Sequence, residues 1–210
     1  MALEIQRIEM VKKIEKKFKL HPYIKKAFLE VNRKSYVPIG FGHIAYELDA
    51  LPIQQNQWIS SPLTVAKMTQ YLEIQGVDKV LEIGCGSGYQ AAILSKLCRR
   101  VFTIERIDSL LKDAKDRFRK DKINNIFTRF DDGQRGWREY APYDRILFSA
   151  TTKRIPEVIF EQLAEGGTLL APIEQNQEQI ITKFKKINGQ IISYSIEPCR
   201  FVPIMNGRVK

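Results

Sequence analysis

Apolar residues in the first third of the chain recur every three or four positions, the spacing of an amphipathic helix with one face turned to a core. In the first such stretch the apolar positions alternate with lysines and are Ile8, Val11, Ile14 and Phe18. The helices predicted in this part of the chain cover residues 2–18, 22–31 and 62–74. Ser61 and Pro62 suit the N-cap and the first position of the third helix. Residues 35–61, rich in proline, glycine, aromatic residues and glutamine, are expected to be irregular, and an irregular run of that length is usually functional or disordered.

A different rhythm begins near residue 80, where short apolar runs alternate with helical segments. The expected strands are residues 80–83, 101–104, 125–129, 144–149 and 168–171, and the expected helices are residues 89–97, 108–120 and 156–163. Gly166-Gly167 is expected to end the last of these helices. Two further runs, 180–184 and 191–196, predict a β-hairpin, because the Asn188-Gly189 pair between them supplies the positive φ that a tight turn needs. Strands that alternate with helices, followed by an antiparallel hairpin, predict an α/β fold with a doubly wound, mostly parallel sheet.

The composition is that of an ordinary globular domain. The sequence has 210 residues, of which 44% are hydrophobic, enough for one sizeable core. No apolar run approaches the roughly 18 residues that a membrane span needs, and the first residues lack the pattern of a signal peptide. Cys85, Cys98 and Cys199 show no paired spacing, so we expect reduced thiols in the cytoplasm. Neither His21 nor His43 lies near a cysteine in the sequence, so no metal site is expected, and no Ser-His-Asp chemistry either.

The net charge of +10 is unevenly distributed. The basic excess lies in residues 1–40 and 96–145, whereas residues 41–95 contain more acidic than basic side chains. Such a charge favours contact with polyanions, either nucleic acid or anionic lipid. The simpler interpretation is the solvated basic surface of an enzyme, since the sequence contains no aromatic–basic RNA-binding motif.

A glycine-rich turn follows the expected strand at residues 80–83. It reads Gly84-Cys85-Gly86-Ser87-Gly88, and glycines there let the backbone approach a ligand closely at the carboxyl edge of a parallel sheet. The spacing G-x-G-x-G differs from the dinucleotide pattern G-x-G-x-x-G. Glu82, just before the turn, does not suit a pyrophosphate. It suits a ligand that carries positive charge, such as the ammonium and sulfonium of S-adenosylmethionine.

Two further acids follow the next strands. Glu105 ends the strand after the glycine turn, where a carboxylate can accept hydrogen bonds from both hydroxyls of a ribose. Asp132-Gly133 follows the third strand, and an aspartate there could accept a hydrogen bond from an adenine amino group. Acids at three successive strand ends of a basic protein predict a site for S-adenosylmethionine. The simpler alternatives are a strand-end salt bridge for Glu82 and a plain turn for Asp132-Gly133.

The segment after the fourth parallel strand bears on the methyl acceptor. Methylation of adenine N6 typically needs a [D/N]-P-P-[Y/F] clamp there, and methylation of cytosine C5 needs a nucleophilic cysteine. The chain has Ser149-Ala150-Thr151-Thr152, which provides neither. A carboxylate acceptor is already ionised at pH 7 and needs no base. Its catalyst has only to align it with the methyl group and hold it by hydrogen bonds.

Several motifs match one known family. The most specific one precedes the glycine turn and reads Ala50-Leu51-Pro52-Ile53, then Gln57, Ile59-Ser60 and Pro62. The other matching segments are residues 80–94, residues 101–106, Asp132-Gly133 with Gly136-Trp137, residues 141–144, residues 155–167 and Arg200-Phe201-Val202-Pro203-Ile204. On these residues the chain resembles protein-L-isoaspartate (D-aspartate) O-methyltransferases from about Val31 to Met205.

The resemblance implies a Rossmann-like class I S-adenosylmethionine-dependent methyltransferase with extra N-terminal helices. We expect a single domain over residues 1–210. Residues 1–75 would form the N-terminal helices and the substrate-side segment, residues 76–175 the cofactor-binding core, and residues 176–210 the C-terminal hairpin and tail. The implied reaction is methyl transfer to the α-carboxylate of L-isoaspartyl, and also D-aspartyl, residues in damaged proteins, which starts their repair through a succinimide. The implied partners are isoaspartyl proteins and peptides, and we expect a monomer.

The resemblance also assigns site residues. Ser60 would hold the acceptor carboxylate, to which its hydroxyl can donate one hydrogen bond; the alternative is that Ser60 only caps the helix that follows. The expected cofactor-binding residues are Glu82, Gly84, Cys85, Gly86, Ser87, Glu105, Arg106, Asp132 and Gly133. The expected substrate-side residues are Gln57, Trp58, Ile59, Arg200, Phe201, Val202 and Pro203.

The chain departs from the family pattern close to the acceptor. Gln54 and Asn56 stand where small residues are usual, and Trp58 stands where the family has a threonine. If Trp58 narrows the acceptor pocket, Trp58→Thr raises turnover on generic isoaspartyl peptides. Two alternative functions stay open. One is a relative of the family that methylates another carboxylate in a dedicated peptide. The other is a basic protein that binds RNA or an anionic surface on a methyltransferase scaffold.

Overall fold

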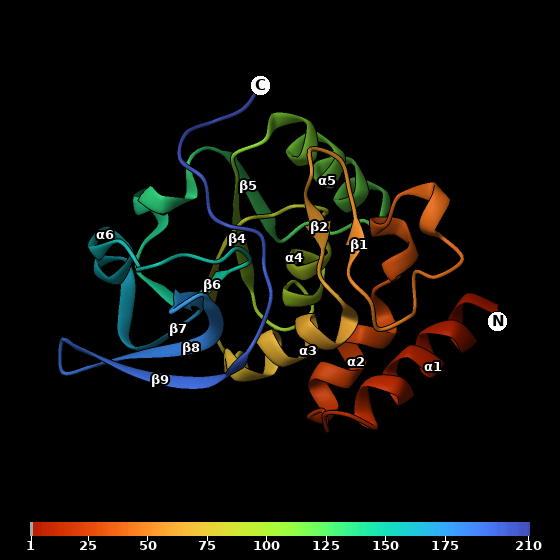
Figure 1. The fold of residues 1–210 in the computed structure, drawn as a ribbon, viewed down its shortest axis with the longest axis horizontal. Coiled ribbons are helices and arrows are strands. Elements are labelled where there is room, and N and C mark those ends of the chain that lie inside the picture. Colours follow the sequence, from red (N-terminus) through yellow and green to blue (C-terminus); the bar gives the residue numbers. More distant parts are fainter. Residues whose placement is uncertain (1) are drawn as a thin grey trace.

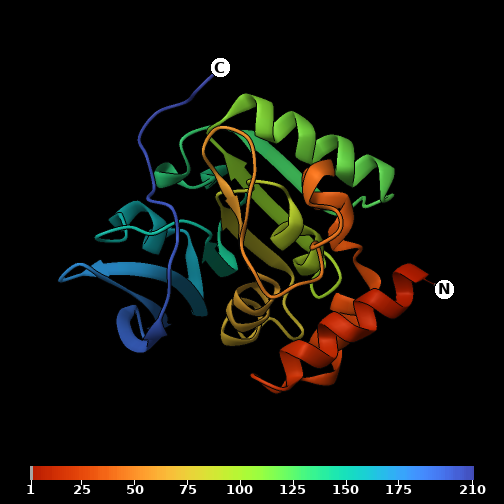
Figure 2. The same cartoon turned by 45° about the vertical axis from the view of Figure 1, so that its right-hand side comes forward.

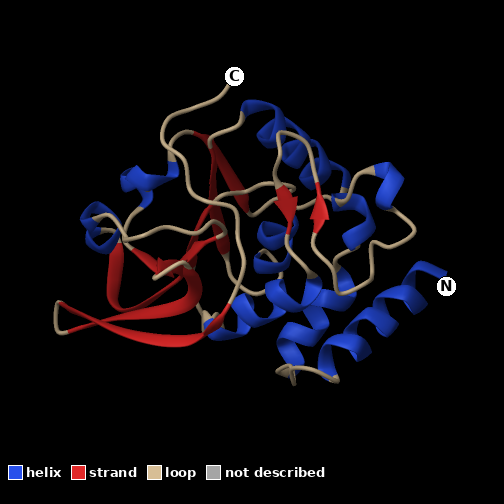
Figure 3. Ribbon diagram, viewed as in Figure 1, coloured by secondary structure: helices blue, strands red, loops and turns tan. Residues whose placement is uncertain are grey.

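A seven-stranded sheet crosses the centre of the molecule in the computed structural model, which describes residues 2–210 (Figures 1 and 3). Its strands are β3 (Lys79–Ile83), β4 (Arg100–Glu105), β5 (Ile126–Phe130), β6 (Tyr143–Phe148), β7 (Leu163–Gln175), β8 (Glu178–Ile187) and β9 (Gln190–Pro198). The helices are α1 (Ala2–Glu15), α2 (Pro22–Glu30), α3 (Pro62–Tyr71), α4 (Tyr89–Leu94), α5 (Asp108–Lys120) and α6 (Glu157–Glu161). Short 3-10 helices are η1 (Arg33–Tyr36), η2 (Ile39–Phe41), η3 (Gly133–Arg135) and η4 (Arg138–Tyr140).

The strand order across the sheet is β5-β4-β3-β6-β7-β8-β9. The strands from β5 to β7 pair in parallel, and β7, β8 and β9 pair antiparallel. The chain therefore winds outward from β3 in both directions, and a crevice opens at the carboxyl ends where the order reverses. This confirms the predicted doubly wound, mostly parallel sheet with its C-terminal hairpin, including the turn at Asn188-Gly189, where φ is 51° and 75°.

Successive residues of the strands point to opposite faces of the sheet and pack into two hydrophobic cores. Val80 of β3 packs into the core beneath α1 to α5, which gather on one side of the sheet (Figure 2). Leu81 points to the opposite face, where the cover is α6 and an aromatic cluster beside η4. In that cluster the Phe102 ring lies 4.7 Å from Tyr140 and 5.6 Å from Trp137, measured between ring centroids. The two faces are therefore covered unequally, with most of the helical mass on the side that carries the N-terminal elements.

Two expectations about helices need correction. The first helix ends at Glu15 rather than residue 18, α3 ends at Tyr71 rather than residue 74, and α4 and α6 are also shorter than expected. Gly166-Gly167 does not end α6, because that helix stops at Glu161 and the glycines lie inside β7. The pairing of β7 with β6 shifts register at this point, and Gly166 has a φ of 72°. The glycine pair that predicted a helix stop thus lies where the pairing of β6 and β7 is irregular, and such irregularities also favour glycine.

The stretch expected to be irregular is largely so. Within residues 35–61 the regular parts are the end of η1, η2, and the two-residue strands β1 (Leu51–Pro52) and β2 (Trp58–Ile59), which pair antiparallel. The small β1–β2 hairpin stands over the carboxyl edge of the sheet (Figure 1). Within residues 2–210, none of the helices combines the length and the apolar character needed to cross a bilayer.

Candidate functional site

A cleft lies at the carboxyl ends of β3, β4 and β6. Four parts of the chain meet in it: the β2–α3 segment, the glycine loop (residues 84–88), the ends of the central strands, and the segment after β9. The residues that line it are 57–60, Thr64, Val65, Met68, 83–87, Tyr89, Gln90, 104–107, Gly133, Ser149, Ala150 and 201–205. The expected site residues are therefore largely brought together, and Glu82, Asp132 and Arg200 are the ones outside this lining.

The glycine loop is fastened to the end of β4. Gly84 and Gly86 have φ values of 95° and 51°, a conformation that glycine adopts without strain. The N–H groups of Gly84 and Cys85 donate to the carbonyl of Ile104 at 2.9 and 3.2 Å. The Gly86 N–H donates to Glu105 Oε2 at 2.8 Å. The loop therefore presents fixed backbone to the cleft, with no Cβ at Gly84 and Gly86, its two glycines that line the cleft.

Glu105 is a buried carboxylate that lines the cleft. Its second oxygen, Oε1, accepts the Ile107 N–H at 2.9 Å. Burial raises the pKa of Glu105, and the hydrogen bonds from Gly86 and Ile107 oppose that rise. An ionised carboxylate offers about four acceptor positions, so acceptor capacity remains for a hydroxyl-bearing ligand.

Glu82 lies one layer deeper. It is fully buried, its Oε2 accepts the Thr103 hydroxyl at 2.6 Å, and its Oε1 accepts the Ser149 hydroxyl at 3.4 Å. Burial raises its pKa to about 8. Within residues 2–210 Glu82 makes no ion pair, so the strand-end salt bridge considered above is not formed there. It reaches the cleft only through Ser149, which does line it.

Asp132 is already engaged by the protein. Its Oδ1 accepts the Gln134 N–H at 3.0 Å and caps η3, and its Oδ2 accepts the Gly207 N–H at 2.8 Å. The neighbouring Gly133 lines the cleft. The pair is therefore more than a plain turn, because it also ties the C-terminal part of the chain to the end of β5.

The β1–β2 hairpin carries the residues on the other side of the cleft. Its turn is closed by the Ile53 N–H donating to the Gln57 carbonyl at 2.8 Å, with Gln55 and Asn56 at φ values of 60° and 54°. Trp58 lines the cleft with 52% of its surface exposed, so it forms the rim rather than the floor.

Ser60 also lines the cleft, whereas its neighbour Ser61 caps α3 by accepting the Thr64 N–H at 3.0 Å. In the described chain no hydrogen bond uses the Ser60 hydroxyl. The alternative that Ser60 serves only as a helix cap is thus excluded.

The segment after β9 crosses the cleft. Gln179 fixes its start, accepting the Phe201 N–H at 2.6 Å and donating to the Phe201 carbonyl at 3.1 Å. The Thr151 N–H donates to the Val202 carbonyl at 2.8 Å. Phe201, Val202 and Pro203 line the cleft as expected, whereas Arg200 is exposed and stands outside it.

Some cleft residues were not predicted from the sequence. Thr64, Val65 and Met68 occupy one face of α3, and their i, i+1, i+4 spacing is a signal that could have identified them. Gln90 lies in the first turn of α4, just after the glycine loop. For Met205 no local pattern exists, since its place depends on contacts made far away in the sequence.

Two other chemistries find little support in the cleft. Burial raises the pKa of the Cys85 thiol, which disfavours the nucleophilic thiolate. Over the described part of the chain, no three His, Cys, Asp or Glu side chains gather as a metal site would need.

Comparison with known proteins agrees with this geometry. The sequence model of the family described as protein-L-isoaspartate(D-aspartate) O-methyltransferase (PCMT) matches residues 6–209. A protein-L-isoaspartate O-methyltransferase of Helicobacter pylori (strain G27) is 54% identical over 199 residues, which cover 94% of this chain and 95% of the relative. The enzyme of the same name from Maricaulis maris (strain MCS10) is 44% identical over 178 residues, 85% of this chain and 84% of the relative.

Solved structures share the fold. One named protein-L-isoaspartate O-methyltransferase superposes with a TM-score of 0.86 at 27% identity, covering 95% of this chain and 66% of that longer chain. A putative protein-L-isoaspartate O-methyltransferase from Plasmodium falciparum, in complex with S-adenosyl-L-homocysteine, has a TM-score of 0.83 at 22% identity, covering 94% of this chain and 97% of that chain. On the match over residues 6–209 and the identity to these relatives, the chain belongs to the protein-L-isoaspartate(D-aspartate) O-methyltransferase family.

Proposed function

We propose that the chain transfers a methyl group from S-adenosylmethionine to the α-carboxylate of L-isoaspartyl, and also D-aspartyl, residues in damaged proteins. The observation that carries the proposal is one continuous cleft, which joins the glycine loop and Glu105 on one side to Ser60 and Trp58 on the other. Membership of the family and the names of the curated relatives support the same activity.

The residues of the cleft fit the cofactor. S-adenosylmethionine supplies the methyl group, which it carries on a positively charged sulfur. Glu105 keeps acceptor capacity for the ribose hydroxyls, and the backbone of residues 84–87 lies open to close approach. Glu82, beneath Ser149, places a titratable carboxyl below the same loop. A positive charge in the cleft would favour its ionised form and oppose the effect of burial.

The remaining expected cofactor residues border the other end. Arg106 and Gly133 line the cleft beyond Glu105, which suits the adenine. Asp132 Oδ1 and Oδ2 each accept one N–H, from Gln134 and Gly207, so like Glu105 it keeps acceptor capacity, which suits the amino group of the adenine.

The acceptor side needs no base. A carboxylate is ionised at pH 7 and attacks the methyl carbon directly, so the protein contributes alignment and removal of water. Ser60 would donate a hydrogen bond to one carboxylate oxygen. Phe201, Val202 and Pro203 would lie along the peptide backbone, with Gln57, Trp58 and Ile59 on the opposite wall. Arg200 would act outside the cleft, on peptide residues farther from the reacting group.

The methyl ester formed by the enzyme accounts for the repair of isoaspartyl residues. The methyl ester carries a better leaving group, released as methanol, than the free carboxylate does, so the neighbouring backbone nitrogen attacks the ester carbonyl, displaces methanol and closes a succinimide. Hydrolysis of the succinimide then gives aspartyl or isoaspartyl peptide, and repeated cycles enrich the aspartyl form. The partners are therefore proteins and peptides that carry isoaspartate.

Oligomeric state, cellular compartment and the role of the basic surface complete the proposal. Action as a monomer stays a prediction. The three cysteines are free, which supports a reducing compartment such as the cytoplasm. Nucleic acid remains the less favoured partner of the basic surface, and the division at residues 75 and 175 stays a prediction.

Methyl transfer to paired peptides tests the proposal. Two synthetic peptides, identical except for isoaspartate against aspartate, are incubated with labelled S-adenosylmethionine, and base-labile methanol reports ester formation. Transfer to the isoaspartyl peptide alone is expected. Transfer to neither peptide, with cofactor binding confirmed by calorimetry, would instead favour a relative that methylates a different carboxylate in a dedicated peptide.

A further inference from the structure

Arg33, the first residue of η1, is a fully buried cation. Its Nε donates to the Ala45 carbonyl at 2.9 Å, and its Nη2 donates to the Asp49 carbonyl at 3.4 Å. Burial lowers the pKa of Arg33 to about 10, which still leaves the side chain protonated at pH 7. Among the residues that the structure describes, no carboxylate forms an ion pair with it. Because a buried charge without an opposite partner costs free energy, Arg33 is a candidate for a role beyond packing.

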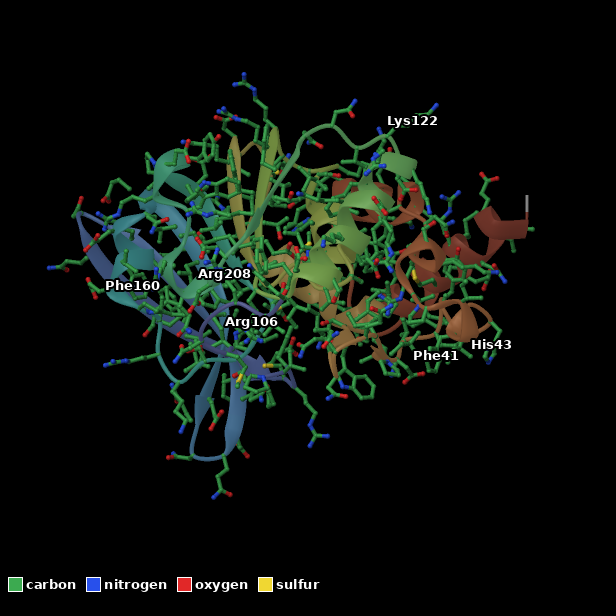
Figure 4. All side chains as sticks on the ribbon, turned by 90° about the horizontal axis from the view of Figure 1, so that it is seen from above. Phe41, His43, Arg106, Lys122, Phe160 and Arg208 are labelled. Carbon is green, nitrogen blue, oxygen red and sulfur yellow. The ribbon has the colours of Figure 1, made fainter. Side chains whose placement is uncertain are left out.

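The two carbonyls that Arg33 holds lie in the loop that leads into the β1–β2 hairpin (residues 42–50). This loop leaves the periphery of the molecule, where Figure 4 shows His43, and turns inward at Ala45, which is buried. Because β1 pairs with β2, the position of the loop also sets that of Ser60, which directly follows β2. The acceptor side of the cleft therefore depends on where Arg33 holds this loop.

The same guanidinium lies over the ring of Tyr89. The Arg33 Cζ is 4.8 Å from the centroid of that ring, and such an attraction between a cation and an aromatic ring is stronger when both are desolvated. Tyr89 is the first residue of α4, is buried and lines the cleft. Its N–H donates to Ser87 Oγ at 3.3 Å. Tyr89 thus fixes the end of the glycine loop, on the cofactor side of the cleft.

Helix α5 supports both η1 and the glycine loop. The Tyr36 hydroxyl donates to Asp121 Oδ2 at 2.7 Å, which ties η1 to the C-cap of α5. Arg117 of α5 donates from Nη1 to the Ser87 carbonyl at 3.2 Å. Both elements are therefore fastened to the same helix, which fixes the distance that the Arg33 side chain spans.

We propose that Arg33 is a positioning residue that holds the two sides of the cleft at the separation methyl transfer needs, one through the loop of residues 42–50 and the other through Tyr89. The inference rests on the proposed function, since it takes the glycine loop as the cofactor side and Ser60 as the acceptor side. Arg33 is not among the residues that line the cleft, so it acts through its neighbours. Transfer needs the acceptor oxygen aligned with the methyl carbon, and a misplacement of about 1 Å can cost roughly a hundredfold in rate.

Kinetics counted per cofactor site separate positioning from folding. S-adenosylhomocysteine is titrated by calorimetry into the wild type and Arg33→Lys, and the stoichiometry gives the fraction of chains with an intact site. Methyl transfer to an isoaspartyl peptide is then measured per intact site. Arg33→Lys is expected to lower kcat about tenfold, because lysine keeps the charge but not the planar, forked donor group. The Kd of S-adenosylhomocysteine and the KM of the peptide should stay within about threefold.

Tyr143→Phe is the matched control for a loss of buried hydrogen bonding. The Tyr143 hydroxyl donates to the Trp137 carbonyl at 2.6 Å in the core on the opposite face of the sheet, away from the cleft. This variant should lose stability and keep its kcat per intact site.

A double-mutant cycle tests the contact with Tyr89. In a Tyr89→Leu background no ring remains under the guanidinium, so Arg33→Lys is expected to lower kcat per site only about threefold. If the lysine variant does not fold, Arg33→Met takes its place in both backgrounds, because methionine introduces no unpaired charge.

Each outcome decides a different point. A wild-type kcat per site in Arg33→Lys or Arg33→Met, or an equal loss in Tyr143→Phe, would assign Arg33 to stability alone and overturn the inference. A tenfold loss in both backgrounds would overturn the route through Tyr89. A wild type that binds S-adenosylhomocysteine but does not methylate the peptide would overturn the proposed function, and the inference with it.

Discussion

Ser61 accepts the N–H of Thr64 at 3.0 Å and thereby caps α3, which leaves the adjacent Ser60 hydroxyl to the cleft. Two serines that are adjacent in the sequence thus have different roles, because their side chains make different contacts at the start of α3. One stabilises the helix, and the other faces the place where an acceptor carboxylate would lie.

The serine pair gives the first prediction. Ser60→Ala should lower kcat/KM for an isoaspartyl peptide by roughly ten- to a hundredfold, because a hydrogen bond to a charged group contributes about 1.5–3 kcal/mol. Its free energy of unfolding should change little. Ser61→Ala is the control and should lower the free energy of unfolding by about 1 kcal/mol through loss of the cap, with kcat/KM nearly unchanged. The opposite assignment of the two effects would show that Ser60 does not hold the substrate.

The burial of Glu82 predicts that the free energy of unfolding depends on pH. Burial raises its folded-state pKa to about 8, so between pH 5 and pH 8 the folded chain retains a proton that the unfolded chain has released. Raising the pH through this window therefore lowers the stability of the wild type. Relative to Glu82→Gln, the wild type should lose more than about 1 kcal/mol of unfolding free energy from pH 5 to pH 8.

Urea unfolding at several pH values measures this difference. Glu178→Gln, which removes one carboxyl from the exposed first residue of β8, is the matched control. If the difference in unfolding free energy between the wild type and the Glu82→Gln variant does not vary with pH, the burial account of Glu82 is contradicted.

The turn between β1 and β2 predicts a stabilising substitution. Gln55 is exposed and has a φ of 60°, where a residue with a Cβ is strained by about 1–2 kcal/mol relative to glycine. Gln55→Gly should raise the free energy of unfolding by a few tenths to about 1 kcal/mol, since the larger entropy of glycine in the unfolded chain offsets part of the gain. Gln54→Gly, at a position without positive φ, should instead be neutral or destabilising. A loss of stability in Gln55→Gly would refute the strain at this turn.

The position of Trp58 at the rim of the cleft predicts its contribution to peptide binding. Because half of its surface is exposed beside the acceptor side, it is placed to contact the peptide rather than to fill the pocket. Trp58→Thr should therefore raise KM for isoaspartyl peptides about fivefold, in line with the loss of apolar contact area, and leave kcat within about twofold. Steady-state kinetics decides between this and the narrowing hypothesis, under which the same substitution raises turnover.

Much of the fold follows from local patterns in the sequence. Short apolar runs with glycine turns located β3, β4 and the loop between them, and Asn188-Gly189 located the final hairpin, because both signals act within a few residues. The prediction that Gly166-Gly167 ends a helix was wrong, because glycine is common both at helix ends and where strand pairing is irregular. Only the pairing of β7 with β6 distinguishes these two situations.

The candidate site divides in the same way. The glycine loop and Glu105 lie within one βαβ unit, formed by β3, α4 and β4, so their spacing alone placed them together. The hydrogen bond between Asp132 and Gly207 joins residues 75 positions apart, and no sequence pattern near either residue predicts it. The expectation that Asp132 accepts a hydrogen bond from adenine therefore stays a prediction, and it could not anticipate that one oxygen of this carboxylate also accepts the Gly207 N–H.

The central claim, repair of isoaspartate, is tested most directly by following the peptide rather than the methyl group. A purified isoaspartyl peptide is incubated with the wild-type chain and excess S-adenosylmethionine, and the isoaspartyl and aspartyl forms are separated by chromatography over time. The account predicts that the isoaspartyl form declines and the aspartyl form accumulates, only when S-adenosylmethionine is present. An isoaspartyl peptide that stays unchanged, with an enzyme that binds the cofactor, would contradict it.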